Sequence, residues 1–270
     1  MKVSTKLLSI VLLLLVSGLL YSNIKMKSEF NRFDKSDTYW TYGRILEQPF
    51  KYLKIDGGNL SMIAFEPSPS YSVRVLREWS GFKQKRVKAY VKSDTLFIDF
   101  PKTPIDLYEK FWMPRMTLVR IFAPELLSVE GFDTNLGMFK MKQKNMTVHI
   151  SGKSKFELES LLRGLDSLKI SQSDSSMVVF EMSPDYKADT SQKAGDKVVV
   201  TEASHPGLVV NMAPREIITN DAMSIKYVDA NLRGYTLLDL GHAQIGSLNL
   251  AIADSSAIIL SGGSLHAIKK

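Results

Sequence analysis

The sequence predicts an all-β protein: a parallel β-helix or β-solenoid with rungs of about 20 residues, preceded by an N-terminal hydrophobic helix for export or anchoring. Three observations support this prediction. Residues 7–21 form an uncharged, leucine-rich run. From position 50, short runs of strand-forming residues alternate with Gly, Pro and Asp turn signals, without an amphipathic helix of ten or more residues up to 130. Farther along, apolar residues recur every 20 positions.

Residues 1–27 are interpreted as a signal peptide or a signal anchor, because lysines flank the uncharged run on both sides. The run is short for a membrane span, which favours a signal peptide. The small-residue cleavage pattern is limited to Val16-Ser17-Gly18, which favours an anchor that contacts the membrane through residues 7–24. Both alternatives predict export to the cell envelope. An uncleaved chain would lie on the periplasmic face of the inner membrane, and a cleaved one in the periplasm or at the outer membrane.

The net charge of +7 is concentrated near the N-terminus. Residues 1–35 hold six basic and two acidic side chains, which gives +4 and leaves +3 for the remaining 235 positions. The basic stretch 83–88 (KQKRVK) is interpreted as a solvated turn and strand face, so we expect no nucleic-acid partner. The chain has no cysteine, which excludes disulfides, a thiol nucleophile and the lipid-modified cysteine of a lipoprotein.

Residues 28–49 are interpreted as a linker that leads into the folded domain. Tyr39, Trp40 and Tyr42 cluster in it. Aromatic rings of this kind can stack on sugars, but we favour a hydrophobic plug at the domain edge.

Residues 50–144 are predicted to form a β-rich lead-in part of the solenoid domain. Strands are expected at 52–55, 60–65, 71–76, 87–91, 96–100, 117–122 and 126–129, with a turn at 56–59.

Residues 145–270 carry the 20-residue repeat. Its two principal columns are apolar throughout: Val148, Leu168, Ala188, Leu208, Val228, Leu248 and Ile268, and Leu158, Val178, Val198, Ile218, Leu238 and Ile258. Each rung is expected to hold two inward-facing strands, and stacked rungs would cover apolar faces that one rung cannot cover alone. Asn220 interrupts a supporting column, and residues 183–197 read either as a rung or as a loop.

Two Asp-Ser-Ser triplets, 174–176 and 254–256, lie 80 residues apart, which corresponds to four predicted rungs. Such a triplet can form a corner whose side chains bond backbone groups, a calcium-binding corner or an acidic sugar-cleaving site. The corner is favoured, because the stepwise glycine-aspartate repeat of calcium-binding solenoids is absent.

No residue is assigned to a catalytic, cofactor-binding or metal site. The four histidines (His149, His205, His242 and His266) share no column and no metal-ligand spacing. Nucleophile-elbow, phosphate-loop and dinucleotide-binding motifs are not found. We therefore expect a protein that is not an enzyme and needs no cofactor.

Four stretches in order, LKIDGGNLSMIAF, KSDTLFIDF, VRIFAPELLSVEGF and IILSGGSLHAI, resemble the head GIN domain family, a domain of unknown function classed with auto-transporter adhesins of Gram-negative envelopes. The resemblance covers roughly residues 50–268. It implies a β-helical domain with an export signal or lipid anchor. The chain departs from the family pattern at Glu130-Gly131-Phe132 and lacks an anchor cysteine. The family provides no functional residues to transfer.

The expected function is that of an exported or membrane-anchored β-solenoid acting as a binding, adhesion or scaffold module. Its partner would be a protein, a glycan or a second copy joined through the exposed C-terminal edge. The alternative is a β-helix enzyme acting on polysaccharide, and a membrane-anchored signalling module ranks last.

Overall fold

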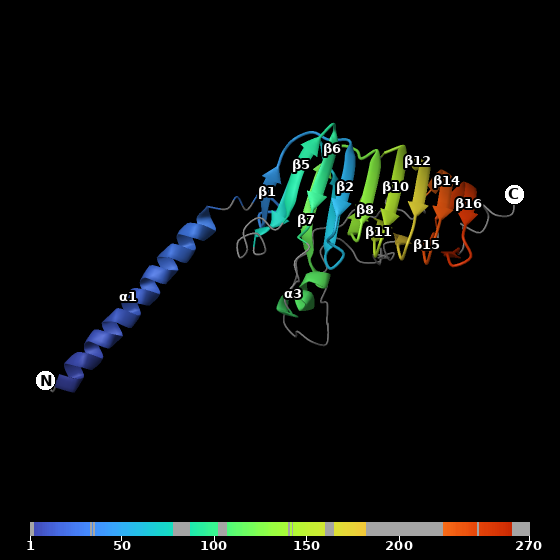
Figure 1. Ribbon diagram of the computed structural model, residues 1–270. Helices are drawn as coiled ribbons and strands as arrows, with labels where there is room; N and C mark the ends of the chain where they lie inside the picture. The colour runs from blue at the N-terminus through green and yellow to red at the C-terminus, as the bar shows by residue number, and fades with distance from the viewer. Residues whose placement is uncertain are drawn as a thin grey trace, which may run out of the picture.

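A computed structural model describes residues 3–32, 34, 36–77, 87–101, 107–139, 141, 143–159, 165–181, 224–241 and 243–260. These residues are mostly β. They form two large mixed sheets preceded by one apolar helix, α1 (Val3–Asn31), which projects away from the sheets (Figure 1).

Helix α1 is exposed along its described length. It is apolar on every side instead of along one stripe, so it has no face that suits water. The stretch Lys6–Asn31 is long and apolar enough to cross a bilayer, and an export signal has the same properties. The helix continues past position 27, so residues 28–31 are helical instead of belonging to an irregular linker.

The nine-stranded sheet has the order β1-β4-β7-β3-β9-β11-β13-β15-β17. The β1–β4 and β4–β7 pairs are antiparallel, and the other pairs are parallel. The strands are β1 (Tyr42–Leu46), β4 (Ser72–Leu76), β7 (Thr117–Ala123), β3 (Met62–Pro67), β9 (Asn135–Met138), β11 (Lys155–Glu159), β13 (Met177–Glu181), β15 (Leu237–Asp239) and β17 (Ala257–Ile259).

The eight-stranded sheet has the order β16-β14-β12-β10-β8-β2-β6-β5, and all its pairs are parallel except β5–β6. A short helix, α3 (Leu107–Trp112), and a 3₁₀ turn, η1 (Met113–Arg115), follow β6. The strands are β16 (Gln244–Ile252), β14 (Ser224–Leu232), β12 (Leu165–Gln172), β10 (Asn145–Ser151), β8 (Ser128–Phe132), β2 (Tyr52–Asp56), β6 (Thr95–Asp99) and β5 (Lys88–Lys92).

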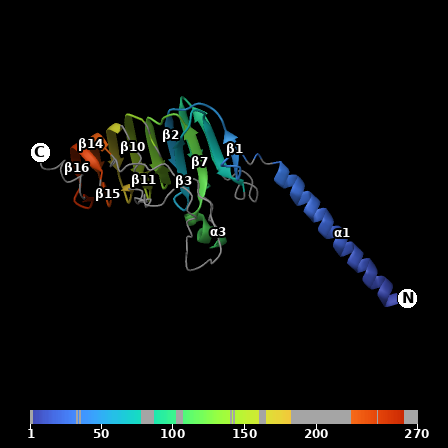
Figure 2. The same ribbon diagram turned by 180° about the vertical axis from the view of Figure 1, so that it is seen from behind.

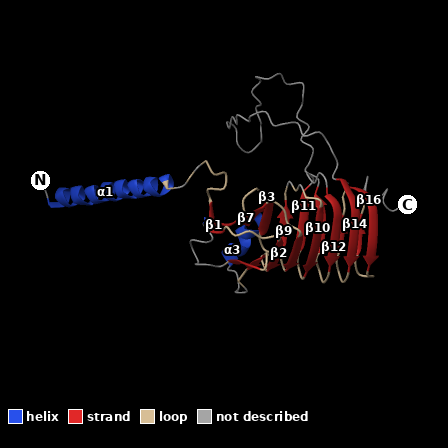
Figure 3. Ribbon diagram, turned by 90° about the horizontal axis from the view of Figure 1, so that it is seen from above, coloured by secondary structure: helices blue, strands red, loops and turns tan. Residues whose placement is uncertain are grey.

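From β8 to β17 the chain alternates between the two sheets, one strand in each (Figures 2 and 3). Strand β10 shows the resulting pattern of burial: its alternate side chains Met146, Val148 and Ile150 face inward and are buried. The inward residues of both sheets form one hydrophobic cluster, so the core lies between the sheets.

The pairing near the C-terminus has the spacing of 20 that the sequence predicted. Val228 pairs with Leu248 and Ala230 with Leu250 across β14 and β16, and Leu238 pairs with Ile258 across β15 and β17.

The predicted pairing of Val148 with Leu168 is wrong, because Val148 pairs with Ile170, a spacing of 22. The additional residues lie between β11 and β12. Leu136 of β9 pairs with Phe156 of β11, and Met146 of β10 pairs with Leu168 of β12. The chain advances ten positions from Leu136 to Met146 (146 − 136), but twelve from Phe156 to Leu168 (168 − 156). A shift by two residues keeps every side chain on its own face of the strand, so the columns remain apolar although they are out of register.

The predicted continuous ladder is also wrong between β12 and β14, which are direct neighbours: Leu168 pairs with Val228, a spacing of 60. Strands β13 and β15 are likewise adjacent, with Val178 paired with Leu238. Because 60 is three times 20, Leu168 and Val228 still belong to the same column of the predicted 20-residue repeat. The repeat therefore predicted two intervening rungs, at positions 188 and 208, that do not lie between these strands. Positions 188, 198, 208, 218 and 268 of the two columns, together with Asn220 and the segment 183–197, lie outside the described residues.

Each strand predicted between 50 and 130 has a counterpart, although the strands predicted at 60–65 and 126–129 each begin two residues later than expected, at Met62 and Ser128. The predicted turn at 56–59 follows β2. Gly57 and Gly58 both have φ of +90°, and a Cβ at Gly58 would lie 2.7 Å from the ring of Phe100. This turn therefore requires glycine.

Candidate functional site

Three arginines lie side by side on the outer surface of the nine-stranded sheet. Arg44 on β1 pairs with Arg74 on β4, and Arg74 pairs with Arg120 on β7. Val73 and Val75 on either side of Arg74 are buried in the core, so strand alternation directs the arginine outward. We call these three residues the arginine row. Like charges directly opposite one another destabilise a sheet, so the row requires compensating anions.

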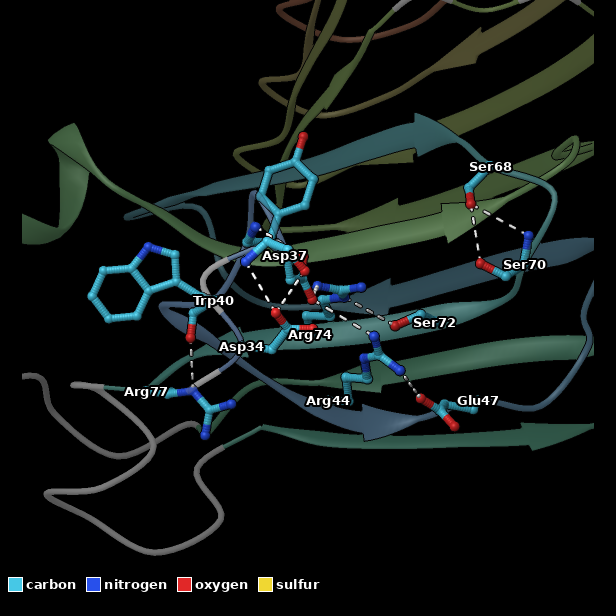
Figure 4. Close-up of polar contacts among 12 residues, drawn as sticks. Asp34, Asp37, Trp40, Arg44, Glu47, Ser68, Ser70, Ser72, Arg74 and Arg77 are labelled. Carbon is cyan, nitrogen blue, oxygen red and sulfur yellow. Dashed lines mark hydrogen bonds and ion pairs between the residues drawn. The ribbon is translucent and has the colours of Figure 1, made fainter. Parts of the chain in front are cut away.

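Two carboxylates compensate the arginine row. Asp37, in the segment between α1 and β1, lies 2.6 Å from Nη1 of Arg74 and 3.6 Å from Nη2 of Arg44 (Figure 4). Glu66 on β3 forms an ion pair with Arg120. Arg74 and Arg120 are only 12% and 22% exposed, so these pairs are less screened by solvent than surface ion pairs.

Tyr39 covers the arginine row. Its ring centre lies 4.6 Å from the guanidinium carbon of Arg120 and 5.8 Å from that of Arg74, within cation–π range. It also packs against Phe122 at 5.2 Å, and its hydroxyl donates to Glu66. Burial and the hydrogen bond to Glu66 raise the pKa of Tyr39 to about 12.

The backbone N–H of Tyr39 in turn donates to Asp37 at 3.0 Å. This hydrogen bond, followed by that from Arg74, holds the pKa of Asp37 below its ordinary value.

The aromatic cluster was predicted to be a hydrophobic plug, and its contacts are more polar than that. The ring centre of Tyr42 also lies 5.1 Å from the guanidinium carbon of Arg120, and the Tyr42 hydroxyl donates a hydrogen bond to the carbonyl of Thr117 at 2.7 Å. Tyr39 and Tyr42 do pack at the edge of the domain, but arginines and an acid supply most of their partners. The arginine row was missed because Arg74 and Arg120 lie on different strands, and only a known register brings them together.

Trp40 joins this segment to α1. Its carbonyl accepts a hydrogen bond from Nε of Arg77 at 3.1 Å, and its ring meets that of Phe30 edge to face at 6.3 Å. The segment 36–42, which we call the docked segment, is therefore held on the sheet by Asp37, Tyr39 and Tyr42 and contacts the helix through Trp40.

The outer face of the eight-stranded sheet carries rows of side chains that run across the paired strands, and Figure 1 shows this sheet from its outer side. One row comprises Tyr90, Phe97, Lys54, Glu130, His149, Ser171, Asn231 and Ala251. Its aromatic and charged members lie on strands β5, β6, β2, β8 and β10, and its small members, Ser171, Asn231 and Ala251, lie toward the C-terminal end.

Exposed aromatic residues gather at the N-terminal end of this face. Tyr52, Tyr90 and Phe132 are 40%, 45% and 49% exposed, and Tyr90 stacks on Phe97 with ring centres 5.1 Å apart and planes 5° from parallel. We call Tyr52, Tyr90, Phe97 and Phe132 the outer aromatic patch. The Lys54–Glu130 ion pair lies between its members. Exposed aromatic rings are enriched at recognition surfaces.

The Asp-Ser-Ser triplets form corners, as predicted. Asp174, with φ of 63°, accepts a hydrogen bond from the backbone N–H of Gly152 at 2.9 Å. Ser255 and Ser256 donate to the carbonyl of Gly234 at 2.9 and 2.8 Å. These side chains bridge to the neighbouring layer of the stack. Among the described strands, β14 lies between β12 and β16, and β15 lies between β13 and β17, so the two corners are two strand pairings apart and not four.

His149 is exposed on β10, whereas His205, His242 and His266 lie outside the described residues, as do positions 83–86. Over the part of the chain that is described, no group of three or more His, Asp or Glu side chains could hold a metal ion.

The sequence matches no protein-family model and no curated protein. Among solved structures, it is similar to a candidate adhesin from Parabacteroides merdae, with 11% identity, a TM-score of 0.49 and coverage of 82% of this chain and 72% of that one. A candidate adhesin from Bacteroides fragilis gives 11% identity, a TM-score of 0.43 and coverage of 80% and 94%. A candidate lipid-binding protein from Parabacteroides distasonis gives 12%, 0.34, 80% and 94%.

Proposed function

We propose that this protein is an exported or membrane-anchored binding module of the cell envelope, acting in adhesion or as a scaffold and without catalysis. The observation that carries the proposal is the outer aromatic patch. Tyr52, Tyr90 and Phe132 are large and exposed, and they lie on β2, β5 and β8 at one end of a single sheet face. Burying such rings against a partner is favourable, and a rigid sheet holds them in place before binding. The partner is a protein or a glycan.

The architecture we propose is a β-solenoid in which each rung contributes one strand to each sheet. The alternation of β8 to β17 between the two sheets supports it, as does the corner at Asp174. The resemblance to the head GIN domain family, carried by the stretches quoted above, points to the same fold. Solenoids present long regular faces that suit binding.

Helix α1 supports a location at the periplasmic face of the inner membrane, with the helix uncleaved. Cleavage of the helix would instead release the domain to the periplasm or the outer membrane. A second copy of the chain is an additional partner in this proposal, joined through the C-terminal edge. Among the described strands, β16 and β17 are the last of their sheets.

Site-specific photocrosslinking in intact cells tests the binding face. A photoreactive amino acid replaces Tyr90 in the full-length chain, and in a matched control it replaces Tyr235, which is 79% exposed and lies between β14 and β15. We expect a defined adduct at position 90 and none at 235. Protease digestion of the adduct distinguishes a protein from a glycan partner. Equal or absent crosslinking at both positions would reject the outer aromatic patch as the binding face.

Localisation is tested by removing residues 1–27. The full chain should fractionate with the envelope and the truncated chain with the cytoplasm. A truncated chain that stays cytoplasmic and still complements a deletion strain would contradict the proposed envelope role.

A further inference from the structure

Helix α3 and turn η1 protrude from the domain. In Figures 1 and 2 they extend from the lower side of the sheets, the side toward which α1 runs from Asn31 to Val3. Trp112 and Met113 attach the protrusion to the core: Met113 is buried and Trp112 packs against the core cluster. Phe111, which directly precedes Trp112, is 74% exposed. Met116, which directly follows η1, is 37% exposed. The protrusion thus presents apolar side chains outward from a firmly held base.

The chain between α1 and the sheet is too short to allow the domain to move far from the helix. Five residues separate Asn31 from Asp37, which is fixed on Arg74. A fully extended chain of this length spans at most about 20 Å. The remainder of the docked segment is held by Tyr39 on the arginine row and by Trp40 on Arg77. If α1 spans a bilayer, this short link keeps the domain close to the lipid surface, and in the arrangement of Figures 1 and 2 the side that carries α3 is the one turned toward it.

The exposed side chains of the protrusion suit the interfacial zone of a bilayer. Aromatic rings concentrate at the boundary between headgroups and acyl chains, and basic residues pair with anionic headgroups. Phe111 and Met116 supply the apolar surface, and exposed Lys110 supplies the positive charge. A single exposed phenylalanine on a soluble surface is unremarkable by itself. Here it lies on a protruding element beside a proposed membrane anchor.

We propose that the α3–η1 protrusion is a second membrane contact, with Phe111 inserted in the interface of the bilayer that α1 spans. This inference rests on the proposed anchoring by α1. Two contact points, one spanning and one interfacial, fix the tilt of the domain. The outer aromatic patch is then presented at a set orientation to the membrane.

Quenching of a site-specific fluorophore tests this contact in the full-length chain. The chain has no cysteine, so one introduced cysteine is labelled uniquely. The label is an environment-sensitive dye, and the membrane is a vesicle of phosphatidylethanolamine and phosphatidylglycerol. Pro114→Cys places it on the exposed part of η1 and leaves Lys110 and Phe111 intact. Tyr235→Cys is the remote control, and Leu14→Cys in α1 reports the anchor.

We expect spin-labelled lipid to quench the dye at position 114 several-fold more strongly than at 235, and aqueous iodide to show the reverse order. Adding Phe111→Ser should return the dye at 114 to the behaviour of the control. If position 14 lies in lipid while 114 behaves like 235, the second contact is rejected and the anchor stands. If position 14 is itself accessible to iodide, the anchoring proposal fails and the second contact fails with it.

Discussion

Replacing Glu66 by Gln tests whether the arginine row depends on its carboxylates. Glu66 is the acid that pairs with Arg120, and it also accepts the hydroxyl of Tyr39. Glutamine has nearly the same shape and keeps an acceptor oxygen, so the substitution removes charge without creating a cavity. Arg120 would then lie opposite Arg74 without its nearest anion.

The magnitude follows from the burial of this pair. An exposed ion pair contributes about 0–1 kcal/mol, whereas losing one partner of a fully buried pair costs about 3–5 kcal/mol. Both Glu66 and Arg120 are 22% exposed, which places them between these limits. Hydrogen bonds to charged groups contribute about 1.5–3 kcal/mol. We therefore expect Glu66→Gln to lower the free energy of unfolding by about 2 kcal/mol, which corresponds to about 4–8 °C in Tm for a domain of this size.

Thermal unfolding of the full-length protein in detergent, followed by circular dichroism, measures this loss. The matched control is Glu47→Gln, because Glu47 pairs with Arg44 of the same row but both side chains are more than half exposed. The control should change Tm little, since exposed pairs contribute little. Equal effects of the two substitutions would show that the arginine row is stabilised by something other than its partly buried carboxylate.

Four further outcomes are expected. The pKa of Tyr39 is raised to about 12, so the stability that its neutral hydroxyl contributes is complete below the ordinary pKa of 10 and is lost as the pH rises from 10 to 12. A phenolate absorbance titration of the wild type and of Tyr39→Phe measures the pKa of this hydroxyl. Because the pKa of Asp37 is lowered, the stability that its carboxylate contributes should decrease only as the pH falls below its ordinary pKa of 3.8. Chemical denaturation measured at several pH values should show this decrease in the wild type and not in Asp37→Asn. Asp174→Ala should cost about 2 kcal/mol in chemical denaturation and Asp174→Gly less, because φ is positive there. Gly58→Ala should cost about 2–3 kcal/mol by the same assay, since its Cβ would meet Phe100.

Local patterns in the sequence predicted the strands and the corners well. Alternation is a property of neighbouring residues, so β2 and β6 could be placed from a few positions each. The turn at Gly57 and the corner at Asp174 are likewise local. Register is different, because it is determined by which strands pair, and a step of two residues leaves the face of each side chain unchanged.

The same limit applies to the candidate site. The arginine row exists only because β1, β4 and β7 are neighbours, although β4 and β7 lie more than 40 residues apart in the chain. The available signal was an arginine at the centre of each apolar strand, SVRVL and TLVRIF. A charged side chain in such a position indicates an outer face with a partner, but not which partner.

The direct contact between β12 and β14 also has a kinetic consequence. From β8 onward in the eight-stranded sheet, the other neighbouring strands pair residues 19 to 22 positions apart, but Leu168 and Val228 are 60 apart. Tripling the closed loop adds about 1 kcal/mol of chain entropy to the cost of that contact. Strands β14 to β17 can associate with one another over short loops before they join the layers that precede them. Within the layers from β8 to β17, this contact therefore closes the longest loop, and under tension or mild denaturant the C-terminal layers should separate there first.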